Sequence, residues 1–134
     1  MAALSTARAT KEREVREIGY PVDAGVKIYG GAMVALNGAG NARPANNGTA
    51  TRCMGVAMQT VDNTTGAAGA QTVVVRRSCF AFGTSNAAPA HVGQVGYALD
   101  DQTIQIGSGG PAAGMVVAVE VVGAVTQVWV DMSV

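Results

Sequence analysis

Apolar residues recur along this chain in short runs, and segments rich in glycine, asparagine and proline separate them. Valine dominates the runs, and its branched Cβ favours the pleated surface of a strand. Such short runs with glycine-rich turns between them are typical of an antiparallel sandwich or barrel. The predicted strands are 26–29, 32–36, 51–60, 71–82, 96–99, 103–106, 115–122 and 125–132.

Two of these runs carry more detailed expectations. Three consecutive valines, 73–75, predict a well-buried stretch within the strand 71–82. In the run 125–132, apolar residues alternate with others, and a period of two indicates a strand with two different faces. Together with 115–122 it predicts a closing hairpin that turns at Gly123 and Ala124.

Charge divides the chain into two parts. Of nine basic and nine acidic residues, seven lie between residues 8 and 17. We therefore predict an extended polar N-terminal arm, residues 1–19, and an all-β body, residues 20–134, that is a small antiparallel β-barrel or β-sandwich. Tyr20 precedes a proline and so favours extended geometry at the entry to the body. The arm has no wide apolar stripe, and we expect it to be extended or transiently helical until a partner orders it.

Composition narrows the class of protein. The chain has 134 residues, 49% hydrophobic but only 4% aromatic, so its core must consist of small and aliphatic side chains. A formal net charge of zero argues against direct nucleic-acid binding and against a polybasic membrane anchor. No apolar run approaches the roughly 20 residues of a membrane span, and residues 1–10 lack the apolar stretch of a signal peptide. We therefore expect synthesis in a cytosol and no membrane partner.

The residues that most often carry chemistry are isolated. His91 has no cysteine or acidic residue near it in sequence, which favours a solvated or locally hydrogen-bonded side chain over a catalytic or metal-binding one. Asp100 and Asp101 could ligate a hard cation, but the calcium-loop pattern is missing and a tight turn is favoured. The glycine-rich segment 107–110 lacks the Lys-Ser/Thr ending of a phosphate loop. We assign no catalytic, cofactor-binding or metal-binding residue and predict that the protein is not an enzyme.

Three further sets of residues leave alternatives open. Cys53 and Cys79 are interpreted as reduced, buried thiols, with a disulfide or a reactive thiol as the other possibilities. Arg76 and Arg77 are consecutive in a predicted strand, so one can lie on a solvated face while the other meets a partner or an internal acid. Glu120 either faces solvent or pairs with one of these arginines.

Five segments together resemble a known family. In order along the chain they are 25–37 (GVKIYGGAMVALN), 61–64 (VDNT), 73–77 (VVVRR), 100–103 (DDQT) and 128–130 (VWV). They resemble the small capsid cement, or head decoration, proteins of tailed bacteriophages, closest to the type found in Mu-like phages, and the resemblance spans residues 10–134. It implies a non-enzymatic virion protein, made in the host bacterial cytoplasm, on the exterior of the icosahedral capsid.

The same resemblance implies partners. Such a protein binds the major capsid protein between capsomers, stabilises the head against internal DNA pressure, and self-associates, with a homotrimer expected first and a dimer second. Charge placement alone selects the capsid-interface candidates, which are Arg8, Lys11, Arg13, Arg16 and Glu17. The alternative is a ligand- or carbohydrate-binding β-domain of a virion, whose aromatic candidates are Tyr20, Tyr29, Tyr97 and Trp129.

Overall fold

The computed structural model describes residues 2–10, 16–46, 48–107 and 109–133, and in these residues the chain is all β apart from one short 3₁₀-helix. The all-β prediction is thus confirmed. None of the described residues forms a helix with the length and apolar character needed to cross a membrane. The strands are β1 (Glu17–Pro21), β2 (Val26–Ile28), β3 (Met33–Leu36), β4 (Ala42–Pro44), β5 (Gly55–Ala57), β6 (Val61–Asn63), β7 (Thr72–Arg76), β8 (Cys79–Thr84), β9 (Val95–Ala98), β10 (Thr103–Ile106), β11 (Ala112–Val122) and β12 (Val125–Asp131), with the 3₁₀-helix η1 at Pro89–His91.

The first seven strands form one part of the body, residues 16–77, here called the N-terminal lobe. Its main sheet has the order β1-β7-β5-β3-β4, with antiparallel neighbours throughout. A parallel bridge between Val22 and Ala42 links the chain just after β1 to β4, so the two ends of the sheet meet. β2 and β6 form a separate antiparallel pair.

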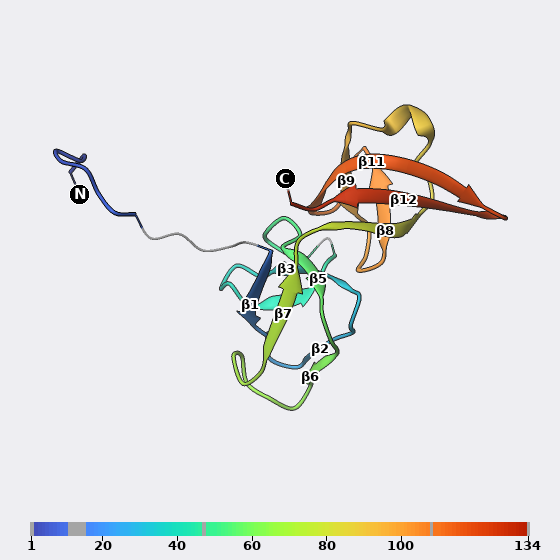
Figure 1. The fold of residues 1–134 in the computed structure, drawn as a ribbon. Helices are drawn as coiled ribbons and strands as arrows, with labels where there is room; N and C mark the ends of the chain where they lie inside the picture. The colour runs from blue at the N-terminus through green and yellow to red at the C-terminus, as the bar shows by residue number, and fades with distance from the viewer. Residues whose placement is uncertain (1, 11–15, 47, 108, 134) are drawn as a thin grey trace.

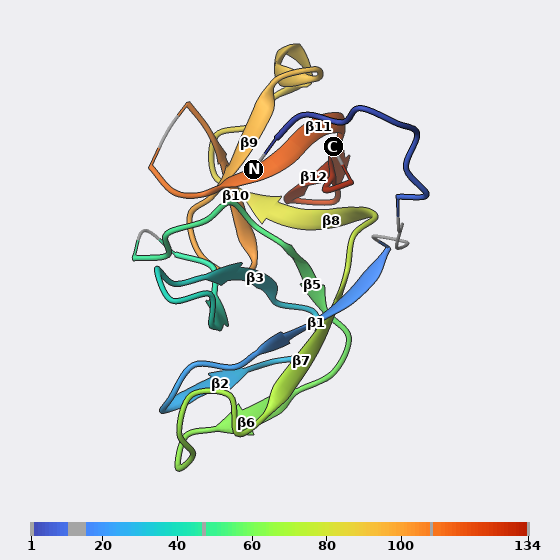
Figure 2. The same ribbon diagram turned by 90° about the vertical axis from the view of Figure 1, so that its left-hand side faces the viewer.

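The last five strands form a closed barrel of order β10-β8-β12-β11-β9, residues 78–133, here called the C-terminal barrel. All its neighbours are antiparallel except β10 and β8, which run parallel. Both ribbon views place the labelled strands of the N-terminal lobe on one side of the molecule and those of the barrel on the other (Figures 1 and 2).

The two parts share strand β3. Side chains of Met33 and Ala35 belong to the core of the barrel, whereas Val34 belongs to the core of the N-terminal lobe. All three are fully buried, which explains why this strand is a continuous apolar run rather than an alternating one. Main-chain hydrogen bonds cross between the parts here, from Met33 N to Asp101 O at 2.8 Å and from Cys53 N to Ala112 O at 2.9 Å.

The valine run in β7 is not buried throughout. Val73 and Val75 are 0% exposed, but Val74 between them is 37% exposed. The prediction that all three are buried is therefore wrong, because β7 has one face on the core and one towards solvent. The predicted strand 71–82 also divides in two, since the chain leaves the N-terminal lobe at Arg77 and enters the barrel at Cys79.

The predicted closing hairpin is present and long. β11 and β12 pair from Met115 opposite Asp131 to Val122 opposite Val125. The two-residue turn between them contains Gly123 with φ 64°, a conformation that glycine adopts without strain. In Figure 1 this hairpin extends beyond the rest of the barrel.

Candidate interaction surfaces

The arm contributes an exposed segment. Every residue from 2 to 10 is exposed, and the one main-chain hydrogen bond described for this stretch is internal, from Thr10 N to Arg8 O at 3.1 Å. Figure 1 shows the segment lying apart from both parts of the body. The candidate Arg8 is therefore presented to solvent, while the candidates Lys11 and Arg13 lie outside the described residues.

Paired structure begins before the predicted boundary at residue 20. Arg77 N donates a hydrogen bond to Arg16 O at 2.8 Å, and Glu17 lies opposite Arg76 at the start of the β1–β7 ladder. The Glu17 carboxylate accepts hydrogen bonds from Nη2 of Arg76 at 2.5 Å and from its Nε at 3.1 Å. Glu17 is thus part of the body's first strand, and a truncation after Gly19 would remove most of that strand.

A cleft of about 460 Å³ lies where the arm joins the body. Asp131 in this cleft accepts hydrogen bonds from the main-chain N and the hydroxyl of Ser133, and the hydroxyl bond is the main cause that lowers the pKa of this carboxyl. Arg77 Nε donates to Met132 O at 3.3 Å. The cleft therefore holds cations and a carboxylate together, and its lining consists of Arg16, Arg77, Ser78, Cys79, Asp131 and Ser133.

The two cysteines differ in exposure. Cys53 is fully buried in the shared core, and burial raises the pKa of its thiol to about 12. Cys79 is exposed, which overturns the prediction that both thiols are buried. Its position on β8 opposite Asp131 explains this, because the side chain projects from the barrel into the cleft rather than into the core. Both cysteines are free thiols, as expected.

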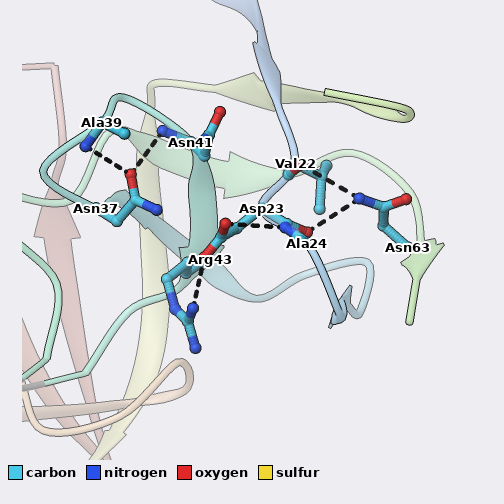
Figure 3. A network of polar contacts seen from close by, with 8 residues as sticks. All are labelled: Val22, Asp23, Ala24, Asn37, Ala39, Asn41, Arg43 and Asn63. Atoms are coloured by element: carbon cyan, nitrogen blue, oxygen red, sulfur yellow. Dashed lines mark hydrogen bonds and ion pairs between the residues drawn. The ribbon is translucent and has the colours of Figure 1, made fainter. Parts of the chain in front are cut away.

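A polar network fixes the chain that follows β1 (Figure 3). Asn63 is buried at the end of β6, and its Nδ2 donates to Val22 O at 3.3 Å and to Asp23 O at 3.0 Å. Asp23 in turn accepts a hydrogen bond from Nη1 of Arg43 at 2.6 Å, and this bond is the largest cause that lowers the pKa of Asp23. The network joins the chain after β1, at the end of that strand away from the arm, to β4 and β6, so its role is to hold these parts of the N-terminal lobe together.

The isolated residues that could carry chemistry make local contacts. His91 Nδ1 accepts a hydrogen bond from Ala88 N at 2.9 Å, which confirms the locally bonded interpretation. Asp100 Oδ1 accepts from Gln102 N at 2.9 Å in the turn between β9 and β10, as predicted for a tight turn. Burial and then the neighbouring Asp100 raise the pKa of Asp101. Within the described ranges, no group of three or more His, Cys, Asp or Glu residues is placed to hold a metal ion.

The aromatic candidates for a sugar site lie on different elements. Tyr20 on β1 packs against the core of the N-terminal lobe, and Tyr29 after β2 is exposed beside the Lys27 ammonium, 4.9 Å from its ring centre. Tyr97 lies on β9 and Trp129 on β12, both in the barrel. The ring pair that the described structure contains is formed by two other residues, Phe80 and Phe82.

Charge is strongly divided between the two halves of the chain, a feature that the zero net charge of the whole conceals. Residues 1–77 carry all nine basic residues and five acidic ones, a formal charge of +4. Residues 78–134 carry no lysine or arginine and four acidic residues, Asp100, Asp101, Glu120 and Asp131, a formal charge of −4. This difference can be found from the sequence alone, by counting the formal charge separately before and after Arg77.

The chain was compared with protein-family models, with curated proteins and with solved structures, and none of them matches it.

Proposed function

We propose that this protein is a structural component of a tailed-phage virion that binds the outer surface of the icosahedral capsid between capsomers. There it stabilises the head against the pressure of packaged DNA. The observation that carries the proposal is the contrast between an exposed segment, residues 2–10, and a hydrogen-bonded β body whose last five strands close into a barrel. The segment resemblances at 25–37 and elsewhere supply the class of partner.

The arm suits attachment to a large, repetitive surface. A segment that is exposed when free can order against a partner and cover a wide area, although the entropy of ordering lowers its affinity per unit area. Charges of both signs between residues 8 and 17 favour pairing with a complementary surface, which sets register more than affinity. If the copies also contact one another on the shell, avidity compensates for the low affinity of each single contact.

The body suits the space between neighbouring subunits. Closure of the C-terminal sheet into a barrel removes unpaired strand edges, which otherwise invite unspecific pairing, everywhere except at the distal end of β11. Its core of valine, alanine and methionine, with few aromatic rings, makes a small and well-packed unit. We expect such units to repeat around a symmetry axis, with a homotrimer at three-fold sites as the first expectation and a dimer as the second.

The proposed partners follow from this role. The protein binds the major capsid protein on the exterior of the virion, after synthesis in the host cytoplasm, and contacts neither membrane nor nucleic acid directly. Among the capsid-interface candidates, Arg8 and Arg16 are exposed. Glu17 is held by Arg76, so its use on the shell requires that this ion pair be shared or exchanged.

A cosedimentation assay tests the proposal. The purified protein is mixed with undecorated heads of the parent phage, and unassembled capsid subunits serve as the control. Saturable binding to heads but not to subunits is expected and gives the copy number. Absence of binding to heads at micromolar protein would contradict the proposal, and a glycan-binding screen would then test the sugar-binding alternative.

A further inference from the structure

The distal half of the β11–β12 hairpin has an unpaired edge. β9 pairs with β11 only from Ala112 to Met115, and the chain before β9 reaches only Val116, whose carbonyl accepts a hydrogen bond from Gly93 N at 2.8 Å. Beyond that point, residues 118–122 pair with β12 on one side, Val117 forms a bulge, and residues 117–122 pair with no other strand of the described chain. Their outward main-chain groups are therefore open to an added strand.

The side chains of this hairpin end are unusually apolar for an exposed position. Val121 is 71% exposed, Val122 59% and Val125 57%, and all three surround the turn. The one charged side chain between residues 117 and 125 is Glu120. An exposed, apolar strand edge with little charge is a site for β-strand addition, either by a specific partner or by aggregation.

The arm has the properties of the missing strand. Residues 2–10 contain no proline, so each of them can donate a main-chain hydrogen bond to a ladder. They are exposed, nine in number against the six residues of the open edge, and Arg8 is their one charged residue. A single cation on the arm thus matches a single carboxylate on the edge.

The open β11 edge could pair either with the arm of a second copy or with the β11 edge of a second copy. Charge favours the arm. Pairing two β11 edges would bring together two barrels that each carry four acidic residues and no lysine or arginine. Placing residues 2–10 of one copy on the barrel of the next instead brings one cation, Arg8, and no carboxylate to a half of formal charge −4. Such complementarity fixes which surfaces meet and speeds their encounter.

We propose that residues 2–10 of one copy add as a strand to the open β11 edge, residues 117–122, of a second copy. The contact is head-to-tail, so repeating it around an axis closes a ring. This contact would join neighbouring copies on the capsid, and that biological setting rests on the proposed function. The stretch 11–17, which carries six of the seven charged residues between 8 and 17, remains for the capsid, and Arg8 then faces the neighbouring copy instead of the shell.

Two full-length variants separate the two sides of the contact. In a hairpin with a two-residue turn, the closing pair Val122–Val125 exchanges both main-chain hydrogen bonds, so Val121 N–H points away from β12. Val121→Pro therefore blocks the open edge and leaves the hairpin ladder intact, whereas Val121→Thr keeps the N–H and serves as its matched control. Ser5→Pro with Ala7→Pro removes two donors from the arm, far from any contact of the body.

Sedimentation velocity then gives a complementation test. We expect the wild-type protein and Val121→Thr to sediment above the 13.5 kDa of one copy, with the excess mass lost in high salt. The edge variant and the arm variant should each be monomeric alone. Mixed together they should form a dimer of twice that mass, because each supplies the side that the other lacks.

Other outcomes overturn the proposal in distinct ways. A monomeric wild-type protein, or association of the edge variant alone, would show that the arm does not bind this edge in a second copy. Association of the arm variant alone would show that two β11 edges pair directly. Head binding by a wild-type protein that stays monomeric would retain the capsid proposal and reject only this contact, whereas self-association without head binding would do the reverse.

Discussion

The N-terminal lobe and the C-terminal barrel are both β structures with aliphatic cores, but they differ in sheet topology, charge and strand edges. Both are small β structures built mainly from aliphatic residues, but the barrel is a closed sheet, whereas in the lobe a single bridge between Val22 and Ala42 links the chain after β1 to β4. The lobe is basic, and the buried Asn63 and the Asp23–Arg43 ion pair stabilise the chain that follows β1. The barrel is acidic, and its β11–β12 hairpin has an open edge. The two parts thus differ in the sign of their charge and in the presence of an open strand edge, while both have aliphatic cores.

The largest expected effect comes from breaking the core of the lobe. Val75→Asp should unfold it, because an unpaired carboxylate in a fully buried position costs several kcal/mol or more, roughly the total stability of a small domain. Val74→Asp is the matched control on the same strand, and its exposed position should keep the fold. Circular dichroism and urea unfolding check both variants, and an unfolded Val74→Asp protein would contradict the assigned faces of β7.

Thiol labelling distinguishes the two cysteines and so sharpens the contrast between the shared core and the cleft. At pH 8 a thiol reagent should modify Cys79 in the native protein at least about 100-fold faster than Cys53, because a buried thiol of pKa about 12 offers almost no thiolate. In denaturant both should react at similar rates. Equal rates in the native protein would mean that the core around Cys53 opens readily or is not packed as described.

A smaller effect is expected from removing side-chain hydrogen bonds of one asparagine in each part, Asn63 in the lobe and Asn86 in the barrel. Asn63→Ala should lower the free energy of unfolding by about 1–3 kcal/mol, since it leaves buried carbonyls without their donor. Asn86→Ala in the barrel removes a pair of hydrogen bonds to Ile106, but these are exposed and water can replace them. Its effect should be clearly less than that of Asn63→Ala in chemical denaturation. Equal losses would show that the Asn63 network is not the stronger tie.

The smallest effect is a pH dependence of opposite sign at two carboxyl groups, Asp23 in the lobe and Asp101 in the barrel. The hydrogen bond from Arg43 lowers the pKa of Asp23 below its ordinary 3.8, so this group stabilises the fold above that pH and loses its contribution as the pH falls through its lowered pKa. Burial raises the pKa of Asp101, so this group favours folding at low pH and loses that contribution as the pH rises through its raised pKa.

Replacing each of the two aspartates by asparagine tests the sign of its contribution to the pH dependence of stability. Asp23→Asn should lower the Tm at pH 7 and reduce its decline in acid, whereas Asp101→Asn should raise the Tm at pH 7 and have little effect near pH 3. Thermal unfolding between pH 2.5 and pH 7 measures both. A fall in Tm at pH 7 for both variants would contradict the opposite environments of the two carboxyls.

Alternation and turn chemistry predicted much of the fold. The strand 103–106 was predicted with the bounds that β10 has, and the closing hairpin was predicted with its turn. β4 was missed because Ala42–Pro44 lies in a segment rich in asparagine and glycine, and its pairing with β3 and the bridge to Val22 are long-range contacts that local propensity does not contain. The burial of Val74 was misjudged because three consecutive valines give no alternation to read.

The interaction surfaces were only partly predictable. The arm was predicted from its charge and stays a prediction, whereas the pairing of Glu17 with Arg76 depends on residues 59 positions apart in the chain. The open edge of β11 could not be predicted, since it depends on where β9 ends in three dimensions. The charge division at Arg77, in contrast, needed only a count by halves, and considering the net charge of the whole chain concealed it.

Head binding by charge variants of the arm tests the central claim most directly. A full-length protein with Lys11, Arg13 and Arg16 all replaced by glutamine is compared with the wild type by cosedimentation with undecorated heads, and Lys27→Gln, on the exposed face of β2, is the control. The account predicts at least about tenfold weaker binding for the arm variant and unchanged binding for the control. Equal binding of all three proteins would contradict a role for the charged arm in attachment to the capsid.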